Sequence, residues 1–314
     1  MSTIVRPYKQ FERFTPNNII VALLLSLFYI GLAYYVIGWR NDHLNLLTLL
    51  LFSYFATPLS RKIFWAFLFF VIYWLLYDSL RAYPNYMVNE VSIQELYEFE
   101  KQVFGISTVN GTVTPNEYAA IHSHPFLDVL APAFYLTWVP IPMLFVVYLF
   151  YTNKYMMARF AFSFLLVNIV GLIIYYIYPA APPWYVADYG FDFQPNTPGS
   201  PAGLIKFDEF FGINVFEGMY AKNGNVFAAI PSLHSAFPVL LVYFGIKMRL
   251  VGAYIFFFII LAGIWFAAVY TNHHYIIDVL LGGLTALFSI LLLENCLLKT
   301  RFKNWLDNYT ELLK

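Results

Sequence analysis

Hydrophobic residues are grouped along this chain in long runs, separated by short polar or proline-containing segments. A helix needs about 20 apolar residues to cross the hydrocarbon core of a bilayer, and most of the runs reach that length. The pattern predicts eight membrane-embedded helices, at residues 18–38, 44–57, 61–80, 126–151, 157–178, 232–248, 250–270 and 273–295. The second run is short, so a re-entrant or interfacial segment is the alternative there. The predicted fold class is an all-α polytopic membrane protein with about eight transmembrane helices.

Two long connections, 81–125 and 179–230, interrupt the hydrophobic runs. Residues 90–104 place apolar side chains among Glu and Gln at roughly helical spacing, which predicts an interfacial amphipathic helix. The 179–230 connection is rich in Pro, Gly and aromatic residues, so we expect an irregular cap. No internal repeat is visible. We divide the chain into an N-terminal segment with two accessory helices (1–60), a membrane core (61–298) and a basic tail (299–314).

Composition supports a membrane protein. Of the 314 residues, 61% are hydrophobic and only 11% are charged, whereas ordinary soluble domains have about 25% charged residues. The formal net charge is zero, which argues against nucleic acid as a partner. A single cysteine, Cys296, excludes an internal disulfide framework and a cysteine-based zinc site.

The distribution of basic residues predicts the orientation in the membrane. If all eight segments cross, one side holds most of the Lys and Arg side chains, namely Arg6, Lys9, Arg13, Arg61, Lys62, Lys154, Arg159, Lys247, Arg249, Lys299, Arg301, Lys303 and Lys314. Positive charge marks the cytoplasmic side. Both termini are therefore expected in the cytoplasm, and the two long connections on the extracytoplasmic (periplasmic or lumenal) side. All six histidines fall on that second side. If 44–57 does not cross, only the first span changes direction.

Two histidines have polar neighbours that suggest chemistry. His234 follows Pro231-Ser232-Leu233, and His274 precedes Asp278 by four residues. Ionisable residues beside long apolar runs are functional candidates by default. We expect His274 and Asp278 to share one helix face, so that the carboxylate holds one ring nitrogen and leaves the other for attack or proton transfer.

A phosphate site is expected next to these histidines. Proline suits the first turn of a helix, so the sixth span is predicted to begin near Ser232 and the eighth near His273. Free backbone N–H groups at a helix N-terminus bind anions. Two histidines and a carboxylate around such a site suit phosphoryl transfer through a phosphohistidine, in which one histidine attacks and the other protonates the leaving oxygen.

The same residue types have other common roles in proteins. His43, His122 and His124 are interpreted as interfacial residues at the level of the lipid headgroups. Adjacent histidines in a helix diverge by about 100°, which disfavours a zinc site built from His234, His273, His274 and Asp278; no metal is expected. No nucleophile elbow surrounds Ser232 or Ser235. The pair Gly282-Gly283 is interpreted as a helix-packing contact.

At these residues the chain resembles a known group. Pro-Ser-x-His, followed some forty residues later by His-x-x-x-Asp, resembles the second and third signatures of the type 2 phosphatidic acid phosphatase superfamily. Within it, five ordered motifs resemble the fungal inositol phosphorylceramide synthases, the targets of aureobasidin. These motifs are Ala181–Tyr185, Pro198–Leu204, Phe211–Ile213, Ile230–His234 and His273–Asp278. The resemblance spans about residues 179–290.

The resemblance implies a six-helix catalytic core preceded by two extra helices, and chemistry without a metal or cofactor. It implies that His274, oriented by Asp278, attacks phosphorus, and that His234 acts first as acid and then as base. Further substrate-binding residues are predicted to be Ser232, His273, Tyr275, Trp184 and Arg81. The superfamily's first signature, a Lys followed by Arg-Pro, is missing from the outer face. Arg81 is our candidate for the phosphate's cationic partner, and an ordinary interfacial arginine is the alternative.

The predicted function is a lipid phosphotransferase that moves a phosphoinositol or related headgroup from a glycerophospholipid to ceramide or a similar lipid alcohol and releases diacylglycerol. Its partners are the two lipids. The alternative enzyme is a lipid phosphate phosphatase that uses the same histidines with water as acceptor. A transporter or lipid-binding scaffold would show matching broken spans in two halves, and no such repeat is present.

Overall fold

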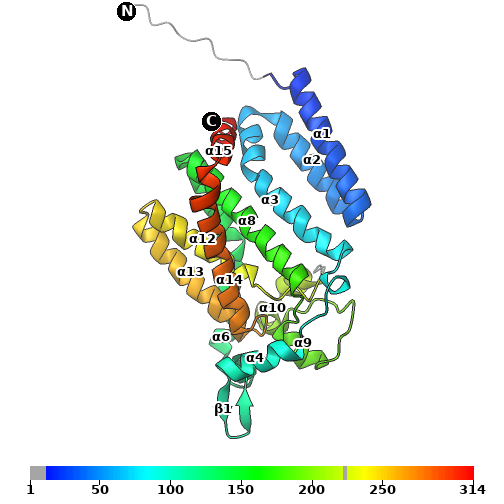
Figure 1. Ribbon diagram of the computed structural model, residues 1–314, viewed down its shortest axis with the longest axis vertical. Helices are drawn as coiled ribbons and strands as arrows, with labels where there is room; N and C mark the ends of the chain where they lie inside the picture. Colours follow the sequence, from blue (N-terminus) through cyan, green and yellow to red (C-terminus); the bar gives the residue numbers. More distant parts are fainter. Residues whose placement is uncertain (1–11, 222–224) are drawn as a thin grey trace, which may run out of the picture.

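The computed structural model of the protein describes residues 12–221 and 225–314, which form mainly helices running between two ends of an elongated molecule (Figure 1). The C-terminus and α15 (Phe302–Leu312) lie at one end, and the short elements of the two long connections lie at the other. Two of the basic residues used in the charge argument, Arg6 and Lys9, lie outside the described residues.

The first two helices form a hairpin beside the rest of the molecule (Figure 1). Helix α1 (Pro16–Leu32) ends in a π-helical turn (Ala33–Ile37), and α2 (Asn41–Ala56) runs back. Gly38 has φ = +94° at the reversal, a conformation that glycine adopts without strain. Apolar side chains from α1 and α2 pack against α3 (Pro58–Ala82). The assignment of these two helices as accessory to a catalytic core stays a prediction.

Helix α8 (Lys154–Ile177) is the most deeply buried of the long helices. It packs against α3, α7 (Pro140–Thr152), α12 (Leu233–Lys247) and α14 (Ile276–Leu291), and α13 (Val251–Tyr270) covers α12. Phenylalanine, tyrosine and leucine side chains from these helices form the largest hydrophobic cluster. A helix that is apolar on all sides is typical of such a central position.

The predicted single span 126–151 is wrong as one continuous helix. The structure has α6 (Pro125–Tyr135), a 3₁₀ turn (Leu136–Trp138) and α7, with a bend of 40° between the two helices. Pro140 begins α7, and it lacks the backbone N–H that would continue the preceding helix. The bend places the end of α6 toward the interior of the bundle.

The number of spans is not settled by helix length. Within the described residues, five helices are long and apolar enough to cross a membrane, or six if the bent pair α6–α7 counts as one. Helix α12 has 15 residues and α2 has 16, so both are shorter than a typical span. The predicted total of eight therefore stays a prediction, whereas a helical multi-pass membrane fold is confirmed.

The two long connections fold as short elements at one end of the bundle (Figure 1). The predicted amphipathic helix is present as α4 (Gln94–Phe104), and a small hairpin follows it. The 179–230 connection consists of short helices joined by irregular segments, as expected for a cap. The remaining elements here are a 3₁₀ turn (Asn85–Met87), β1 (Ile106–Thr108), β2 (Gly111–Val113), α5 (Pro115–Ile121), α9 (Pro183–Tyr189), a second 3₁₀ turn (Ala202–Leu204), α10 (Ile205–Phe211) and α11 (Val215–Tyr220).

The basic tail is helical rather than extended. After α14 a π-helical turn (Leu292–Cys296) and a 3₁₀ turn (Leu297–Lys299) lead into α15. The buried side chains of Leu306 and Leu313 join the main hydrophobic cluster, and charged residues occupy the opposite face. Helix α15 therefore closes the end of the bundle that is farthest from the histidine motifs.

Candidate active site

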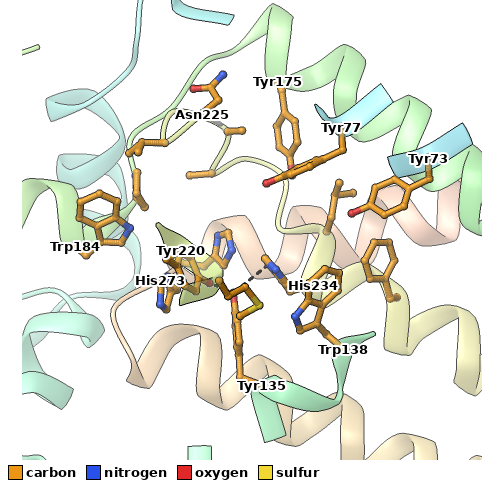
Figure 2. Close-up of a pocket in the computed structure, with 18 residues that line it drawn as sticks. Tyr73, Tyr77, Tyr135, Trp138, Tyr175, Trp184, Tyr220, Asn225, His234 and His273 are labelled. Carbon is orange, nitrogen blue, oxygen red and sulfur yellow. Dashed lines mark hydrogen bonds between the residues drawn. The ribbon is translucent and has the colours of Figure 1, made fainter. Parts of the chain in front are cut away.

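A cavity of about 200 Å³ contains the three histidines of the sequence motifs. His234, His273 and His274 all line it, together with Trp184. Figure 2 shows His234 and His273 on one side of the cavity and Tyr73, Tyr77 and Tyr175 across from them. Four of the eight residues predicted for the site thus share one cavity, although they are up to 90 positions apart in the chain (Trp184 to His274).

His234 lies in the first turn of α12. The helix begins at Leu233, and Ser232 is its N-cap, whose Oγ accepts a hydrogen bond from the Ser235 amide at 3.4 Å and from the Ser235 hydroxyl at 3.0 Å. A serine N-cap contributes about 1 kcal/mol to helix stability. The predicted helix start near Ser232 is confirmed, and the cap directs the His234 ring toward the cavity.

The N-terminal ends of α12 and α14 are held directly against each other. The Ser232 amide donates to the Asp278 carbonyl at 3.0 Å. A Cβ atom on Gly282 would lie 2.1 Å from the Ser232 carbonyl oxygen, so only glycine permits this approach. The interpretation of Gly282 as a packing residue is confirmed. Because of this contact the rings of His234 and His274 are only 5.7 Å apart, centroid to centroid.

The expected helical pairing of His274 with Asp278 needs correction. Helix α14 begins at Ile276 with Tyr275 as N-cap, so His273 and His274 precede the helix rather than start it. The two side chains nevertheless meet, with His274 Nδ1 3.5 Å from Asp278 Oδ2. The same Oδ2 accepts a hydrogen bond from the Tyr275 amide at 2.9 Å. Asp278 is thus a cap for α14 that also faces the imidazole.

The imidazole of His274 is neutral in this environment. Burial lowers the pKa of His274 to about 4, although a hydrogen bond to the Ala229 backbone acts in the opposite direction. A neutral imidazole has a nitrogen lone pair available, which a nucleophile requires.

Two of the sequence motifs brace the segment that carries His273. The Trp184 amide donates to the Asn272 carbonyl at 3.0 Å, and the Gly203 amide donates to the Thr271 carbonyl at 2.9 Å. His273 Nε2 is 2.9 Å from the Pro201 carbonyl oxygen, which can only accept, so Nε2 carries the proton. The Pro-Pro-Trp-Tyr and Pro-Gly-Ser-Pro motifs are therefore explained by their contacts with the turn before α14.

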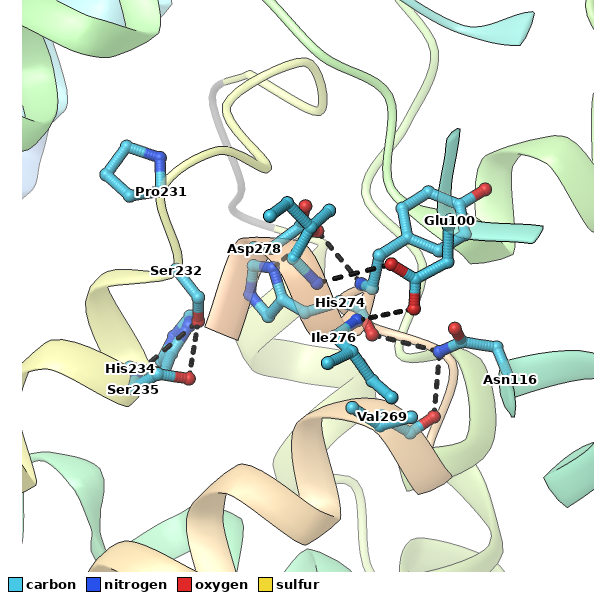
Figure 3. A network of polar contacts seen from close by, with 12 residues as sticks. Glu100, Asn116, Pro231, Ser232, His234, Ser235, Val269, His274, Ile276 and Asp278 are labelled. Carbon is cyan, nitrogen blue, oxygen red and sulfur yellow. Dashed lines mark hydrogen bonds and ion pairs between the residues drawn. The ribbon is translucent and has the colours of Figure 1, made fainter. Parts of the chain in front are cut away.

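Sequence reasoning missed two buried residues that hold the same turn from the opposite side (Figure 3). Glu100, on α4, is fully buried and accepts hydrogen bonds from the amides of Ile276 at 2.8 Å and Ile277 at 3.2 Å. Asn116 donates from Nδ2 to the carbonyls of Val269 and His274, both at 2.9 Å. A carboxylate at a helix N-terminus is favoured by the helix dipole. The 81–125 connection therefore anchors the histidine segment.

The surroundings of Glu100 raise its pKa. Burial raises its pKa from 4.5 to about 7, the two amide hydrogen bonds oppose that rise, and the nearby Asp278 adds to it. The amphipathic pattern predicted α4 but could not show that this glutamate faces inward. The side chain of Glu100 is on the buried face, whereas the neighbouring acidic residues of α4 are exposed.

The other predicted binding residues lie outside the cavity lining. Ser232 is fully buried as an N-cap, and Tyr275 packs in a hydrophobic cluster. Arg81 is 39% exposed and pairs with Asp78 at 3.7 Å. The interfacial interpretation of His43 is wrong, because its ring is fully buried and hydrogen bonds to the Tyr29 hydroxyl at 3.0 Å. His122 and His124 are exposed, as expected.

Eight of the 18 residues that line the cavity are Tyr, Trp or Phe, and no sequence motif singled out its tyrosines and its phenylalanine from the 26 tyrosines and 33 phenylalanines of the chain. No Lys or Arg is present among the described residues that line it. Nor do His, Cys, Asp and Glu side chains gather as a group of three or more suited to a metal ion anywhere in residues 12–221 and 225–314. The aromatic residues of the wall are Tyr73, Tyr77, Tyr135, Trp138, Tyr175, Trp184, Tyr220 and Phe237.

Comparison with known proteins gives the same family as the motifs. The profile of the PAP2 superfamily matches residues 109–292. Phosphoinositol dihydroceramide synthase of Bacteroides thetaiotaomicron is 44% identical to this chain over 301 residues, which cover 95% of this chain and 98% of that protein. Inositol phosphorylceramide synthase of Candida albicans is 27% identical over 246 residues, covering 74% of this chain and 48% of that protein.

A third relative, the inositol phosphorylceramide synthase catalytic subunit of Schizosaccharomyces pombe, is 27% identical over 73% of this chain and 53% of its own length. The chain thus spans about half the length of these fungal relatives. No solved structure matches it. The profile, the relatives and the paired histidine motifs agree, and we conclude that this chain is a membrane-embedded phosphotransferase that belongs to the PAP2 superfamily, in its inositol phosphorylceramide synthase branch.

Proposed function

We propose that this protein transfers a phosphoinositol or closely related headgroup from a glycerophospholipid to ceramide or a similar lipid alcohol and releases diacylglycerol. One observation carries this proposal. The relative that matches along nearly its whole length is a phosphoinositol dihydroceramide synthase, and the two histidines that such a transfer needs line one cavity in this chain.

The arrangement supports a two-step reaction. In the first step His274 attacks the phosphorus of the donor, the bond from phosphorus to the diacylglycerol oxygen breaks, and His234 gives that oxygen a proton. In the second step the acceptor hydroxyl attacks the phosphohistidine and passes its proton to His234, and the phosphorus–nitrogen bond breaks. The 3.5 Å between His274 Nδ1 and Asp278 Oδ2 is longer than a good hydrogen bond. Such contacts commonly tighten when substrate binds.

The cavity wall favours a lipid alcohol over water as acceptor. Its aromatic lining and its volume of about 200 Å³ suit a headgroup, while the acyl chains of donor and acceptor remain in the bilayer. A site that excludes water protects a reactive phosphohistidine from hydrolysis. A phosphatase that uses the same histidines would need water to reach the phosphorus.

Incubation of the purified protein with inositol-labelled phospholipid, with and without ceramide, tests the proposal. We expect labelled phosphoinositol ceramide, and release of diacylglycerol that depends on the acceptor. Free inositol phosphate formed without acceptor would instead establish hydrolysis. Absence of any product with both lipids present would refute an enzyme of this kind.

We further propose that the cavity opens on the extracytoplasmic side and that both termini are cytoplasmic. The charge distribution supports this orientation. Glu209, exposed on α10, offers a test as Glu209→Cys in a Cys296→Ser background. This cysteine should react with an impermeant reagent in intact cells. The native Cys296, which is exposed near the other end of the bundle, is the matched control and should react only in broken cells. The reverse pattern would overturn the orientation.

A further inference from the structure

Tyr135 is the side chain that joins the histidines of the cavity to one another. It is fully buried, and its ring lies 4.9 Å from that of His234 and 5.5 Å from that of His273, centroid to centroid. Its hydroxyl is 3.1 Å from His234 Nδ1, the hydrogen bond drawn in Figure 2. Within residues 12–221 and 225–314, the hydroxyl of Tyr135 is the hydrogen-bonding partner of the His234 ring.

Tyr135 lies at the bend in the fourth apolar segment, 126–151. Tyr135 is the last residue of α6, immediately before the 3₁₀ turn and the 40° bend to α7. Trp138, at the end of the same turn, meets the His234 ring edge to face at 4.6 Å. Residues three positions apart lie on the same face of a helical turn, so the rings of Tyr135 and Trp138 both reach His234.

The hydroxyl of Tyr135 has a second polar contact. Tyr220, the last residue of α11, donates its hydroxyl to the Tyr135 oxygen at 3.2 Å, and its ring stacks on His273 at 4.6 Å. A phenolic oxygen has two lone pairs, so it can accept from Tyr220 and from an imidazole N–H together. The cap formed by the 179–230 connection therefore reaches His234 through two tyrosines.

We propose that Tyr135 is the positioning residue of His234: it accepts the Nδ1–H of the imidazole and thereby assigns proton exchange with the lipid oxygens to Nε2. This inference rests on the proposed function, in which His234 is acid and then base. His234 begins the cycle as the imidazolium, with one proton on each ring nitrogen. In the first step its Nε2 proton goes to the diacylglycerol oxygen as the phosphorus–oxygen bond breaks. In the second, the acceptor's hydroxyl proton returns to Nε2 as its oxygen bonds to phosphorus. His234 ends each cycle with the proton it began with.

His234 acts first as acid and then as base, and the chemical type of the group that holds its Nδ1 matters for both roles. A carboxylate beside an imidazole stabilises the protonated ring, which would hold the proton that an acid must release. A neutral phenol orients the ring and fixes Nδ1 without supplying that charge. The other titratable groups facing the cavity are His273, His274, Tyr73, Tyr77, Tyr175 and Tyr220, and Asp278 lies behind His274. The nearest carboxylate, that of Asp278, therefore faces His274 and not His234.

Tyr135→Phe tests this role, because it keeps the aromatic ring and removes only the hydroxyl. With the natural donor and ceramide we expect kcat to fall about 10- to 100-fold with little change in the donor KM, since proton transfer by a positioned group contributes about 10²–10⁴-fold. The limb of the pH–rate profile that reports His234 should shift. With a nitrophenyl phosphoinositol donor, whose leaving group needs no proton, the initial burst of nitrophenolate should stay within about threefold of wild type.

Tyr29→Phe is the matched control. This substitution removes the 3.0 Å hydrogen bond between Tyr29 and His43, which lies outside the cavity. The reactions with the natural donor and with the nitrophenyl donor should both be unchanged. If Tyr135→Phe is too unstable to purify, Tyr220→Phe should show a smaller loss, again confined to the natural donor. The proposal is overturned if Tyr135→Phe keeps kcat for the natural donor within twofold of wild type. It is also overturned if this variant loses the nitrophenolate burst to the same degree as it loses transfer from the natural donor. Failure of the proposed function is a separate result, namely a wild-type protein that forms no phosphoinositol ceramide.

Discussion

The two histidines at the centre of the cavity have partners of different chemistry. His274 faces the carboxylate of Asp278, whereas His234 faces the neutral hydroxyl of Tyr135. The backbone of the His274 segment is hydrogen-bonded by both long connections, through the side chains of Glu100 and Asn116 on one side and the Trp184 amide on the other. His234 is instead placed by a helix N-cap and by aromatic rings.

This difference fits the two steps of the proposed reaction. A nucleophile gains from a carboxylate that offsets the positive charge developing on its ring when it bonds to phosphorus. An acid that later becomes a base gains from a neutral partner, because the proton must leave and return within each cycle. Substitutions at the two histidines, at Asp278, at Glu100 and at Arg81 test whether the two histidines differ in this way.

Replacing either histidine should have the largest effect. We expect His274→Ala and His234→Ala each to abolish transfer from the natural donor, while the amount of protein in the membrane is unchanged. The two should separate with a nitrophenyl phosphoinositol donor. His234→Ala should still release a burst of nitrophenolate and retain label on the protein, because no acid is needed, and His274→Ala should do neither.

The same two alanine variants can contradict the roles assigned to His274 and His234. Near-normal transfer by either alanine variant would contradict the phosphohistidine scheme. A burst from His274→Ala but not from His234→Ala would exchange the two roles.

Asp278→Asn should have the next largest effect. The amide oxygen can still accept from the Tyr275 amide, so α14 remains capped, but the charge beside His274 is lost. By analogy with the orienting aspartate of catalytic triads we expect kcat to fall by about 10²–10⁴-fold. Unlike Tyr135→Phe, this variant should lose the nitrophenolate burst in parallel with the natural reaction. A variant that retained the burst would show that Asp278 does not act through His274.

Glu100→Gln should have a moderate effect that depends on pH. Burial raises the pKa of Glu100 to about 7, so wild type carries a neutral acid there at low pH and a carboxylate at high pH. Glutamine resembles the neutral form. The ratio of variant to wild-type kcat should therefore approach one near pH 6 and fall, about tenfold, near pH 8, where the carboxylate holds both α14 amides.

The same pKa has a consequence for stability. Because the folded-state pKa of Glu100 is above its ordinary value, the contribution of Glu100 to the free energy of unfolding is largest below pH 4.5 and is lost as pH rises through about 7. The variant cannot ionise. In detergent, the melting temperature of Glu100→Gln minus that of wild type should thus increase between pH 5 and pH 8. A difference that does not change with pH would show that the pKa of Glu100 in the folded protein does not lie in this range.

Arg81→Ala should have the smallest effect. Arg81 is 39% exposed and pairs with Asp78 rather than lining the cavity, and exposed ion pairs contribute about 1 kcal/mol or less. We expect kcat/KM for the natural donor to fall less than about tenfold. A loss of a hundredfold or more, with an unchanged melting temperature, would restore Arg81 as the phosphate's cationic partner.

Local sequence patterns predicted the parts of the molecule that depend on neighbours in the chain. The apolar runs predicted the long helices because burying backbone polar groups in lipid requires helical hydrogen bonding. Proline before Ser232 predicted the start of α12 to within one or two residues. The same reasoning failed at 126–151, where an apolar run contains a break, since hydropathy does not register the missing amide of Pro140.

What the sequence determined by itself is the class of fold, the family, and the identity of His234, His274 and Asp278 as candidates, because these follow from composition and from motifs of fixed spacing. The tertiary structure decided which other side chains share the cavity. Tyr135, Asn116 and Glu100 reach the histidine segments from positions 99 to 176 residues away along the chain, and Tyr220 meets Tyr135 across 85 residues. Contacts of that kind depend on how helices pack and where they bend, and nothing in the local pattern around any one of these residues records them.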